Sequence, residues 1–174
     1  MQFADVVLRS RKDDEKPYQG TLLSFDPGHT TGWCIFQGTS LLECGQLDTD
    51  VVDDASLARI QFLIEKHDYS ECIFEDYRVY KWKLQQHSFS ELHTPKLIGM
   101  IQAACLYNGI EYHKQPASVA KDFCTDDRLK EWNMYITGQR HARDAIRHAC
   151  WYILFGDKAS WHTRKGRTGG TTVG

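Results

Sequence analysis

The chain has 174 residues, of which 41% are hydrophobic and 25% charged, and its formal net charge is −2. A chain of this length is typical of one domain and can bury a hydrophobic core without disulfide or metal crosslinks. No apolar run approaches the roughly 18 residues that favour a membrane span, and the charged N-terminal segment lacks the apolar centre of a secretory signal, so we expect a cytoplasmic protein with no membrane partner.

Hydrophobic runs and turn residues divide the chain into alternating elements. In chain order we predict strands at 21–26, 31–37 and 40–47, a helix at 56–67, a strand at 72–76, a helix at 95–108, a strand at 110–114, helical segments at 116–124 and 126–132, and a final helix at 139–155. Asp53 or Asp54 can cap the first helix, and Thr94 before Pro95 is a typical start of the second. Strands that alternate with helices predict an α/β domain with a mixed, partly parallel sheet.

The composition changes near both ends of the chain. Residues 1–19 are mixed and charged, and we expect an N-terminal arm that is partly disordered, with a possible short strand at 6–8. Residues 158–174 are basic and rich in glycine, which is typical of a flexible tail. The folded domain is therefore predicted to span residues 20–157. The six cysteines form no CxxC pair, so we expect reduced, mostly buried thiols and no zinc site.

Two apolar strands end in acidic residues. Asp26 ends the first and directly precedes Pro27 and Gly28. Asp-Pro-Gly is also good turn chemistry, so this carboxylate alone predicts either a site or a turn. The second strand ends in Glu75 and Asp76, whose side chains point to opposite faces, so only one of them is expected to face Asp26.

A third acidic residue lies on the last predicted helix. His141, Asp144 and His148 follow three- and four-residue steps and therefore share one face. Alternatively, Asp144 is a solvated acid paired with a neighbouring arginine. Hydrolysis of a phosphodiester by two divalent cations about 3.5–4 Å apart needs carboxylates from distant segments to meet. Two strand ends and one helix face are a workable way to build such a cluster.

These segments together resemble the RuvC family of Holliday junction resolvases. DPGHTTGW at 26–33 is similar to the family's first-strand motif. The strand that ends in Glu75, with YRVY at 77–80, is similar to its second acidic motif, and HARDA at 141–145 to its final helix motif. The likeness extends over about residues 20–156, and its character is that of phage-encoded members. It implies an RNase H-like α/β fold, with a mixed five-stranded sheet flanked by helices, in a bacterial or phage-infected cell.

The resemblance also implies an activity. Members of the family are metal-dependent, structure-selective endodeoxyribonucleases that resolve four-way junctions by paired phosphodiester hydrolysis. Their catalytic metal ligands correspond to Asp26, Glu75, His141 and Asp144. Many members have Asp at the position of His141, and a nitrogen ligand suits Mn²⁺ better than Mg²⁺. We therefore expect a two-metal site that works with Mg²⁺ and comparably or better with Mn²⁺.

The segment from Tyr77 to Phe89 interleaves basic and aromatic residues directly after the second acidic strand end. Such a segment can stack on unpaired bases and contact phosphates, and the resemblance implies that an aromatic side chain here engages the junction. Packing in the core is the alternative for each aromatic residue. The candidate DNA-binding residues are Tyr77, Arg78, Tyr80, Lys81, Trp82, Lys83, Lys121 and Arg140, with Lys96 and Lys114 as further candidates for phosphate contacts. The resemblance also implies a homodimer, because a four-way junction offers two symmetric cuts.

The sequence also suggests three alternative functions. The first motif is also similar to the first phosphate loop of actin-like ATPases, but those proteins need two such domains and a second Asp-containing loop, so we expect no nucleotide cofactor. A nuclease that cuts forks and flaps more broadly remains open, as does a catalytically inactive junction-binding protein of the same fold. A net charge of −2 is not typical of a DNA-binding protein and predicts a small DNA footprint or modest affinity.

Overall fold

The computed structural model describes residues 1–11, 16–77 and 92–156. In chain order its elements are α1 (Phe3–Ser10), β1 (Thr21–Asp26), β2 (Thr30–Gln37), β3 (Ser40–Asp48), α2 (Asp54–Ile64), β4 (Glu71–Glu75), α4 (His93–Tyr107), β5 (Glu111–Gln115), α5 (Ala117–Phe123), α6 (Asp126–Glu131) and α7 (Arg140–Phe155). Each strand and helix predicted between residues 21 and 155 corresponds to one of these elements.

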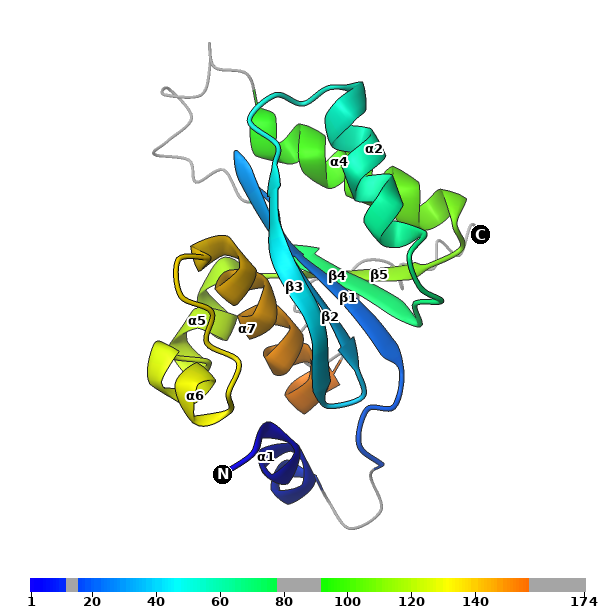
Figure 1. Ribbon diagram of the computed structural model, residues 1–174. Coiled ribbons are helices and arrows are strands. Elements are labelled where there is room, and N and C mark those ends of the chain that lie inside the picture. The colour runs from blue at the N-terminus through cyan, green and yellow to red at the C-terminus, as the bar shows by residue number, and fades with distance from the viewer. Residues whose placement is uncertain (12–15, 78–91, 157–174) are drawn as a thin grey trace, which may run out of the picture.

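The strands form one five-stranded sheet in the order β3-β2-β1-β4-β5 (Figure 1). β1 pairs antiparallel with β2, and β2 with β3, whereas β1 and β4 run parallel, as do β4 and β5. Short turns join the antiparallel strands, and connections that contain a helix lead to the parallel ones. The predicted mixed sheet is confirmed. A consequence is that β1, β4 and β5 end at the same edge.

Helices cover both faces of the sheet (Figure 1). α2 and α4 lie on one face, and α7, with α5 beside it, lies on the other. The central strand β1 is buried on both sides: Leu22 packs into the core under α7, whereas Leu23 and Phe25 pack into the core under α2 and α4. Because side chains alternate along a strand, one apolar strand supplies both cores.

The N-terminal segment forms a helix, α1, so the expected short strand at 6–8 is wrong. Phe3 and Val7 lie one turn apart, are buried, and join the core under α7. The ring centroid of Phe3 lies 4.9 Å from that of Trp132. An isolated helix of 8 residues is too short to be stable in water. Packing against the domain therefore accounts for α1.

Capping chemistry locates one of the two predicted helix starts. The Asp53 side chain accepts a hydrogen bond from the Ser56 backbone N–H at 2.9 Å, as expected of the cap of α2. α4 has Leu92 at its N-cap position, so the expected Thr94 cap is wrong. Pro95 then lies in the first turn, where its missing N–H is tolerated.

Among the described helices, none combines the length and apolar character that crossing a membrane requires.

All six cysteines lie within the described residues as free thiols, and all but the half-buried Cys44 are buried. Burial raises the pKa of the Cys34, Cys72 and Cys150 thiols well above the ordinary value. Because the thiolate is the reactive form, these three side chains are poor nucleophiles and poor metal ligands. They serve as small core residues, as expected.

Candidate metal centre at the edge of the sheet

Three parallel strands end in polar residues at one edge of the sheet: β1 in Asp26, β4 in Glu75 and β5 in Gln115. Phe25 is the register partner of Phe74, and Glu75 is that of Gln115, so the polar ends occupy neighbouring positions. Asp26 and Gln115 are buried, and Glu75 is half-buried. Burial of a carboxylate costs free energy unless the group is paired or binds a cation. This edge of the sheet is therefore a candidate cation-binding site.

Helix α7 adds an imidazole to the two strand-end acids. Ser24 Oγ donates a hydrogen bond to the Ala145 carbonyl oxygen at 2.8 Å, which fixes α7 against β1. Nε2 of the buried His148 lies 3.3 Å from Glu75 Oε2. One ligand atom from each of Asp26, Glu75 and His148 lies within 4.8 Å of the other two. This spacing is close to that of ligand atoms around one divalent cation, whose bonds are about 2.0–2.2 Å long.

Asp26 also contacts His141, in the first turn of α7. His141 Nδ1 lies 2.9 Å from Asp26 Oδ2, and the backbone N–H of His141 donates a hydrogen bond to Gln46 Oε1 at 3.0 Å. The imidazole of His141 is 38% exposed, whereas that of His148 is fully buried. Asp26 therefore has one histidine at the open rim of the cluster and another in its interior.

Asp144 shares the face of α7 with both histidines but is paired with cations. It is buried, its Oδ1 accepts a hydrogen bond from Arg147, and its Oδ2 lies 3.4 Å from Lys121 Nζ. The same Nζ atom is 3.6 Å from Glu75 Oε2. Burial acts to lower the pKa of Lys121, but the charges of Glu75 and Asp144 outweigh burial and raise it. A lysine ammonium thus bridges two of the three carboxylates.

The surroundings push the pKa values of the two strand-end acids apart. Burial raises the pKa of Asp26 to about 6; the hydrogen bond from His141 opposes this shift, and the nearby charges of Glu75 and Asp144 add to it. Burial also acts to raise the pKa of Glu75, but the hydrogen bond and charge of His148 outweigh it, so this pKa is lower than usual. At Glu75 the contribution of His148 thus outweighs burial, whereas at Asp26 burial outweighs the contributions of His141 and His148.

The donor set fits a hard divalent cation. Carboxylate oxygens suit Mg²⁺ and Mn²⁺, and an imidazole nitrogen shifts the preference towards Mn²⁺. The second ring nitrogen of His148, Nδ1, lies 2.9 Å from Gln115 Oε1. Metal-ligating histidines almost always have such a second hydrogen bond. The residues present could therefore hold a metal ion, and a bound cation would stabilise the buried carboxylate of Asp26.

The four residues that the sequence resemblance implied as ligands, Asp26, Glu75, His141 and Asp144, lie at this one edge. The structure adds His148, to which the sequence reasoning gave no role. A signal was present, because His148 follows Asp144 by four residues and shares its helical face. A shared helical face does not show which strand ends the face contacts, so the sequence could not place His148 beside Glu75 and Asp26.

The predicted DNA-binding residues Arg78, Tyr80, Lys81, Trp82 and Lys83 lie outside the described residues. Tyr77 is half-buried and packs against the core under α2 and α4, which is the core-packing alternative. Arg140 is exposed at the first residue of α7. Lys121 lies within the acidic cluster, so its partners in the free protein are carboxylates.

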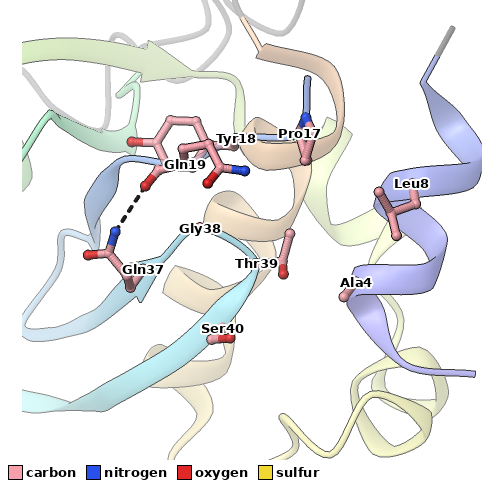
Figure 2. A pocket seen from close by; sticks show the side chains of 9 residues that line it. All are labelled: Ala4, Leu8, Pro17, Tyr18, Gln19, Gln37, Gly38, Thr39 and Ser40. Atoms are coloured by element: carbon pink, nitrogen blue, oxygen red, sulfur yellow. Dashed lines mark hydrogen bonds between the residues drawn. The ribbon is translucent and has the colours of Figure 1, made fainter. Parts of the chain in front are cut away.

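A separate hollow of about 340 Å³ lies at the opposite end of the sheet, between α1 and the turn that joins β2 to β3 (Figure 2). Ala4 and Leu8 of α1 line one side, and Gly38 and Thr39 line the other. It lies at the end of β1 remote from the acidic edge, because Thr21 is the register partner of Gln37. None of its described lining residues offers a carboxylate, imidazole or thiol, so it is a poor candidate for a metal site.

Comparison with solved structures identifies the fold. Thermus thermophilus RuvC superposes with a TM-score of 0.59 at 13% identity, covering 80% of this chain and 97% of that chain. The same organism's RuvC in complex with a Holliday junction substrate gives 0.61 at 12% identity, over 80% and 96% of the two chains. The fowlpox virus Holliday junction resolvase gives 0.51 at 13% identity, over 76% and 97%. The predicted RuvC-type, RNase H-like fold is confirmed.

Sequence comparison does not add to this result. No protein-family model matches the chain, and no curated protein is significantly similar to it. At 12–13% identity a structural likeness identifies the fold and not the activity. The acidic edge itself is therefore the basis for any assignment of activity.

Proposed function

We propose that this protein is a metal-dependent endodeoxyribonuclease that resolves four-way (Holliday) junctions by paired phosphodiester hydrolysis. The observation that carries the proposal is the convergence of Asp26, Glu75 and His148, whose ligand atoms lie within 4.8 Å of one another. The likeness of the fold to two Holliday junction resolvases supports the choice of substrate. Membership of a fold alone would not support it, because one fold serves many functions.

In this proposal each residue of the cluster has a distinct task. Asp26, Glu75 and His148 would hold one divalent cation, and His141 and Asp144 would help to hold a second. Bound cations of this kind polarise the scissile phosphate and lower the pKa of the attacking water. The Gln46 amide and the first turn of α7 hold His141 beside Asp26.

Lys121 and Arg147 would hold the carboxylates of the cluster in place before a metal binds. Lys121 spans Glu75 and Asp144, and Arg147 holds Asp144 to Asp126 at the start of α6. Internal cations of this kind offset the mutual repulsion of the three carboxylates. The same lysine could turn to a DNA phosphate once a metal ion neutralises the acids.

We propose Mg²⁺ as the cofactor, with Mn²⁺ supporting comparable or better activity, because two histidines take part. Imidazole nitrogen favours Mn²⁺ over Mg²⁺. Cleavage would be measured while each metal is titrated separately. Strict dependence on Mg²⁺ would count against His141 and His148 as ligands.

The proposed partner is branched DNA, which the Thermus RuvC complex also contains. Arg140, exposed beside His141, would contact phosphates together with the segment from Tyr77 to Phe89. A homodimer would present two clusters to a symmetric junction. Since each phosphate contact releases counterions, junction affinity should fall linearly with salt concentration on logarithmic axes, and the slope would count the contacts.

The proposal is tested by cleavage of labelled DNA. Purified protein would be incubated with four-way, forked and linear duplex DNA of equal length, with Mg²⁺ or Mn²⁺. The test variant is Asp26→Asn, and the matched control is Asp127→Asn, because Asp127 is exposed on α6. We expect paired, symmetric nicks in the four-way junction from the wild type and the control, and no cleavage by Asp26→Asn.

The other outcomes select the alternatives. Equal cleavage of forks and junctions would make the protein a general nuclease of branched DNA. Tight junction binding without cleavage under either metal would make it a junction-binding protein. Cleavage that survives in Asp26→Asn would show a contaminating nuclease or a different active site.

A further inference from the structure

Gln115, the last residue of β5, contacts His148, the imidazole in the interior of the acidic cluster. Its side chain is fully buried, and its Oε1 lies 2.9 Å from His148 Nδ1. The register of β4 and β5 places it opposite Glu75, the residue that the other ring nitrogen of His148 faces. Gln115 and Glu75 therefore approach the same imidazole at its two nitrogen atoms.

The chemistry of an amide oxygen places one proton of this imidazole. A carbonyl oxygen can only accept a hydrogen bond, so the proton of the bond lies on His148 Nδ1. In the neutral ring the lone pair is then on Nε2. That atom lies 3.3 Å from Glu75 Oε2 and within the cluster that includes Asp26. The ring can therefore face Glu75 in two ways: as an imidazolium that donates Nε2–H to the carboxylate, or as a neutral ring whose Nε2 lone pair binds a cation held between the two side chains.

A purely structural role does not explain this arrangement. The Ser24 hydroxyl already anchors α7 to β1, and apolar side chains such as Ile146 and Ala149 pack the helix into the core. Gln115 Nε2 is buried and has no hydrogen-bonding partner among the described residues. A buried amide with one unsatisfied group costs stability, so an apolar residue would serve better if only packing were required.

We propose that Gln115 is a positioning residue: it holds His148 in the Nδ1–H tautomer, so that Nε2 becomes a ligand of the divalent cation beside Asp26 and Glu75. This inference rests on the metal-dependent function proposed above and extends its ligand set to the inner histidine. In this role Gln115 acts on metal binding through His148 and does not contact DNA. Loss of such an outer hydrogen bond typically weakens metal affinity about 10- to 100-fold.

The experiment combines metal titration with the NMR signature of the imidazole. Mn²⁺ affinity would be measured by calorimetry for wild type, Gln115→Leu and Gln115→Glu, and the ring ¹⁵N shifts of His148 would be recorded with saturating Mg²⁺. We expect about 10- to 100-fold weaker binding for Gln115→Leu. Gln115→Glu, whose carboxylate also accepts from Nδ1, should keep the Nδ1–H tautomer and most of the affinity.

The matched control is Gln102→Leu on α4, where the amide donates to the Tyr112 hydroxyl at 3.0 Å, outside the cluster. It should bind Mn²⁺ as the wild type does. Unchanged affinity in a folded Gln115→Leu variant would overturn the inference. If that variant fails to fold, the wild type still decides, because an Nε2–H tautomer of His148 in the Mg²⁺-loaded protein would also overturn it.

The two proposals fail separately. If the wild type binds metal through the Nδ1–H tautomer but cuts no DNA, the nuclease proposal fails and the role of Gln115 stands. If the wild type cuts junctions while Gln115→Leu binds metal normally, the nuclease proposal stands and the role of Gln115 fails. In both cases the role of Gln115 is decided by metal affinity and by the tautomer of His148, and not by DNA cleavage.

Discussion

Gly32 of β2 touches the backbone of His141 in the first turn of α7. A Cβ atom on Gly32 would lie 1.9 Å from the His141 carbonyl oxygen, so no side chain fits between strand and helix. Gly32 is the register partner of both Asp26 on β1 and Gln46 on β3, and both of those side chains hold His141. One row across three strands thus sets the position of the outer histidine.

Gly32→Ala should move the start of α7 away from the sheet and separate His141 from Asp26. Overpacking of this kind typically costs about 1–3 kcal/mol, and metal affinity should fall with it. Urea denaturation and Mn²⁺ titration measure the two effects. The control is Gly99→Ala on α4, where a Cβ atom meets nothing within 4 Å and the helix should gain up to about 1 kcal/mol. A Gly32→Ala variant with wild-type stability and metal affinity would contradict this account.

Asp26→Asn should stabilise the metal-free protein at pH 7.5. Burial raises the pKa of Asp26 to about 6 in the folded state, above the roughly 3.9 of an unfolded chain. The folded state therefore binds more protons between about pH 4 and pH 6, and the stability contributed by this group is lost as pH rises through that window. Asn removes the buried charge, with a gain on the order of 1–3 kcal/mol.

The gain in Asp26→Asn should be largest at neutral pH and should shrink towards pH 4, where the folded-state carboxyl is already protonated. Urea denaturation of the metal-free proteins at both pH values measures it. Saturating Mg²⁺ should reverse the order at pH 7.5, because the wild type then gains binding energy that the variant lacks. If Asp26→Asn is less stable than the wild type at pH 7.5 without metal, burial of the Asp26 charge does not destabilise the folded state.

Affinity for divalent cations should increase from pH 5 to pH 7. Asp26 must lose its proton to become a ligand, and its pKa of about 6 places that loss within this range. Calorimetry near pH 6 in buffers of different ionisation enthalpy should therefore detect proton release when Mn²⁺ binds. The part of the pH dependence that arises from Asp26 should vanish in Asp26→Asn. A flat affinity profile across this range would contradict the proposal.

Lys121→Met should raise metal affinity in the absence of DNA. The ammonium group lies 3.6 Å from Glu75 Oε2 and 3.4 Å from Asp144 Oδ2, so it competes with a cation for the same oxygens. Removing one partly exposed charge at this range should strengthen binding about 3- to 10-fold. Lys130→Met on α6 is the control, because Lys130 pairs with the exposed Asp127. Unchanged or weaker metal binding by Lys121→Met would show that the lysine does not compete.

The sequence predicted the elements of the sheet and the acids at its edge, because strand periodicity and chain order determine where parallel strands end. It missed α1, because a short helix depends on the packing of Phe3 and Val7 in a core that local pattern does not reveal. It gave no role to His148, because the partner that orients this ring, Gln115, is 33 positions away in the sequence. Side-chain distances of this kind depend on strand register and helix docking together.

The most direct test of the central claim is to locate the metal. Crystals of the protein grown with Mn²⁺ would be measured at a wavelength where manganese scatters anomalously. We predict an anomalous peak bonded to Asp26, Glu75 and His148 Nε2, at ligand distances of about 2.0–2.3 Å. A peak elsewhere, or no peak at saturating Mn²⁺, would contradict the account.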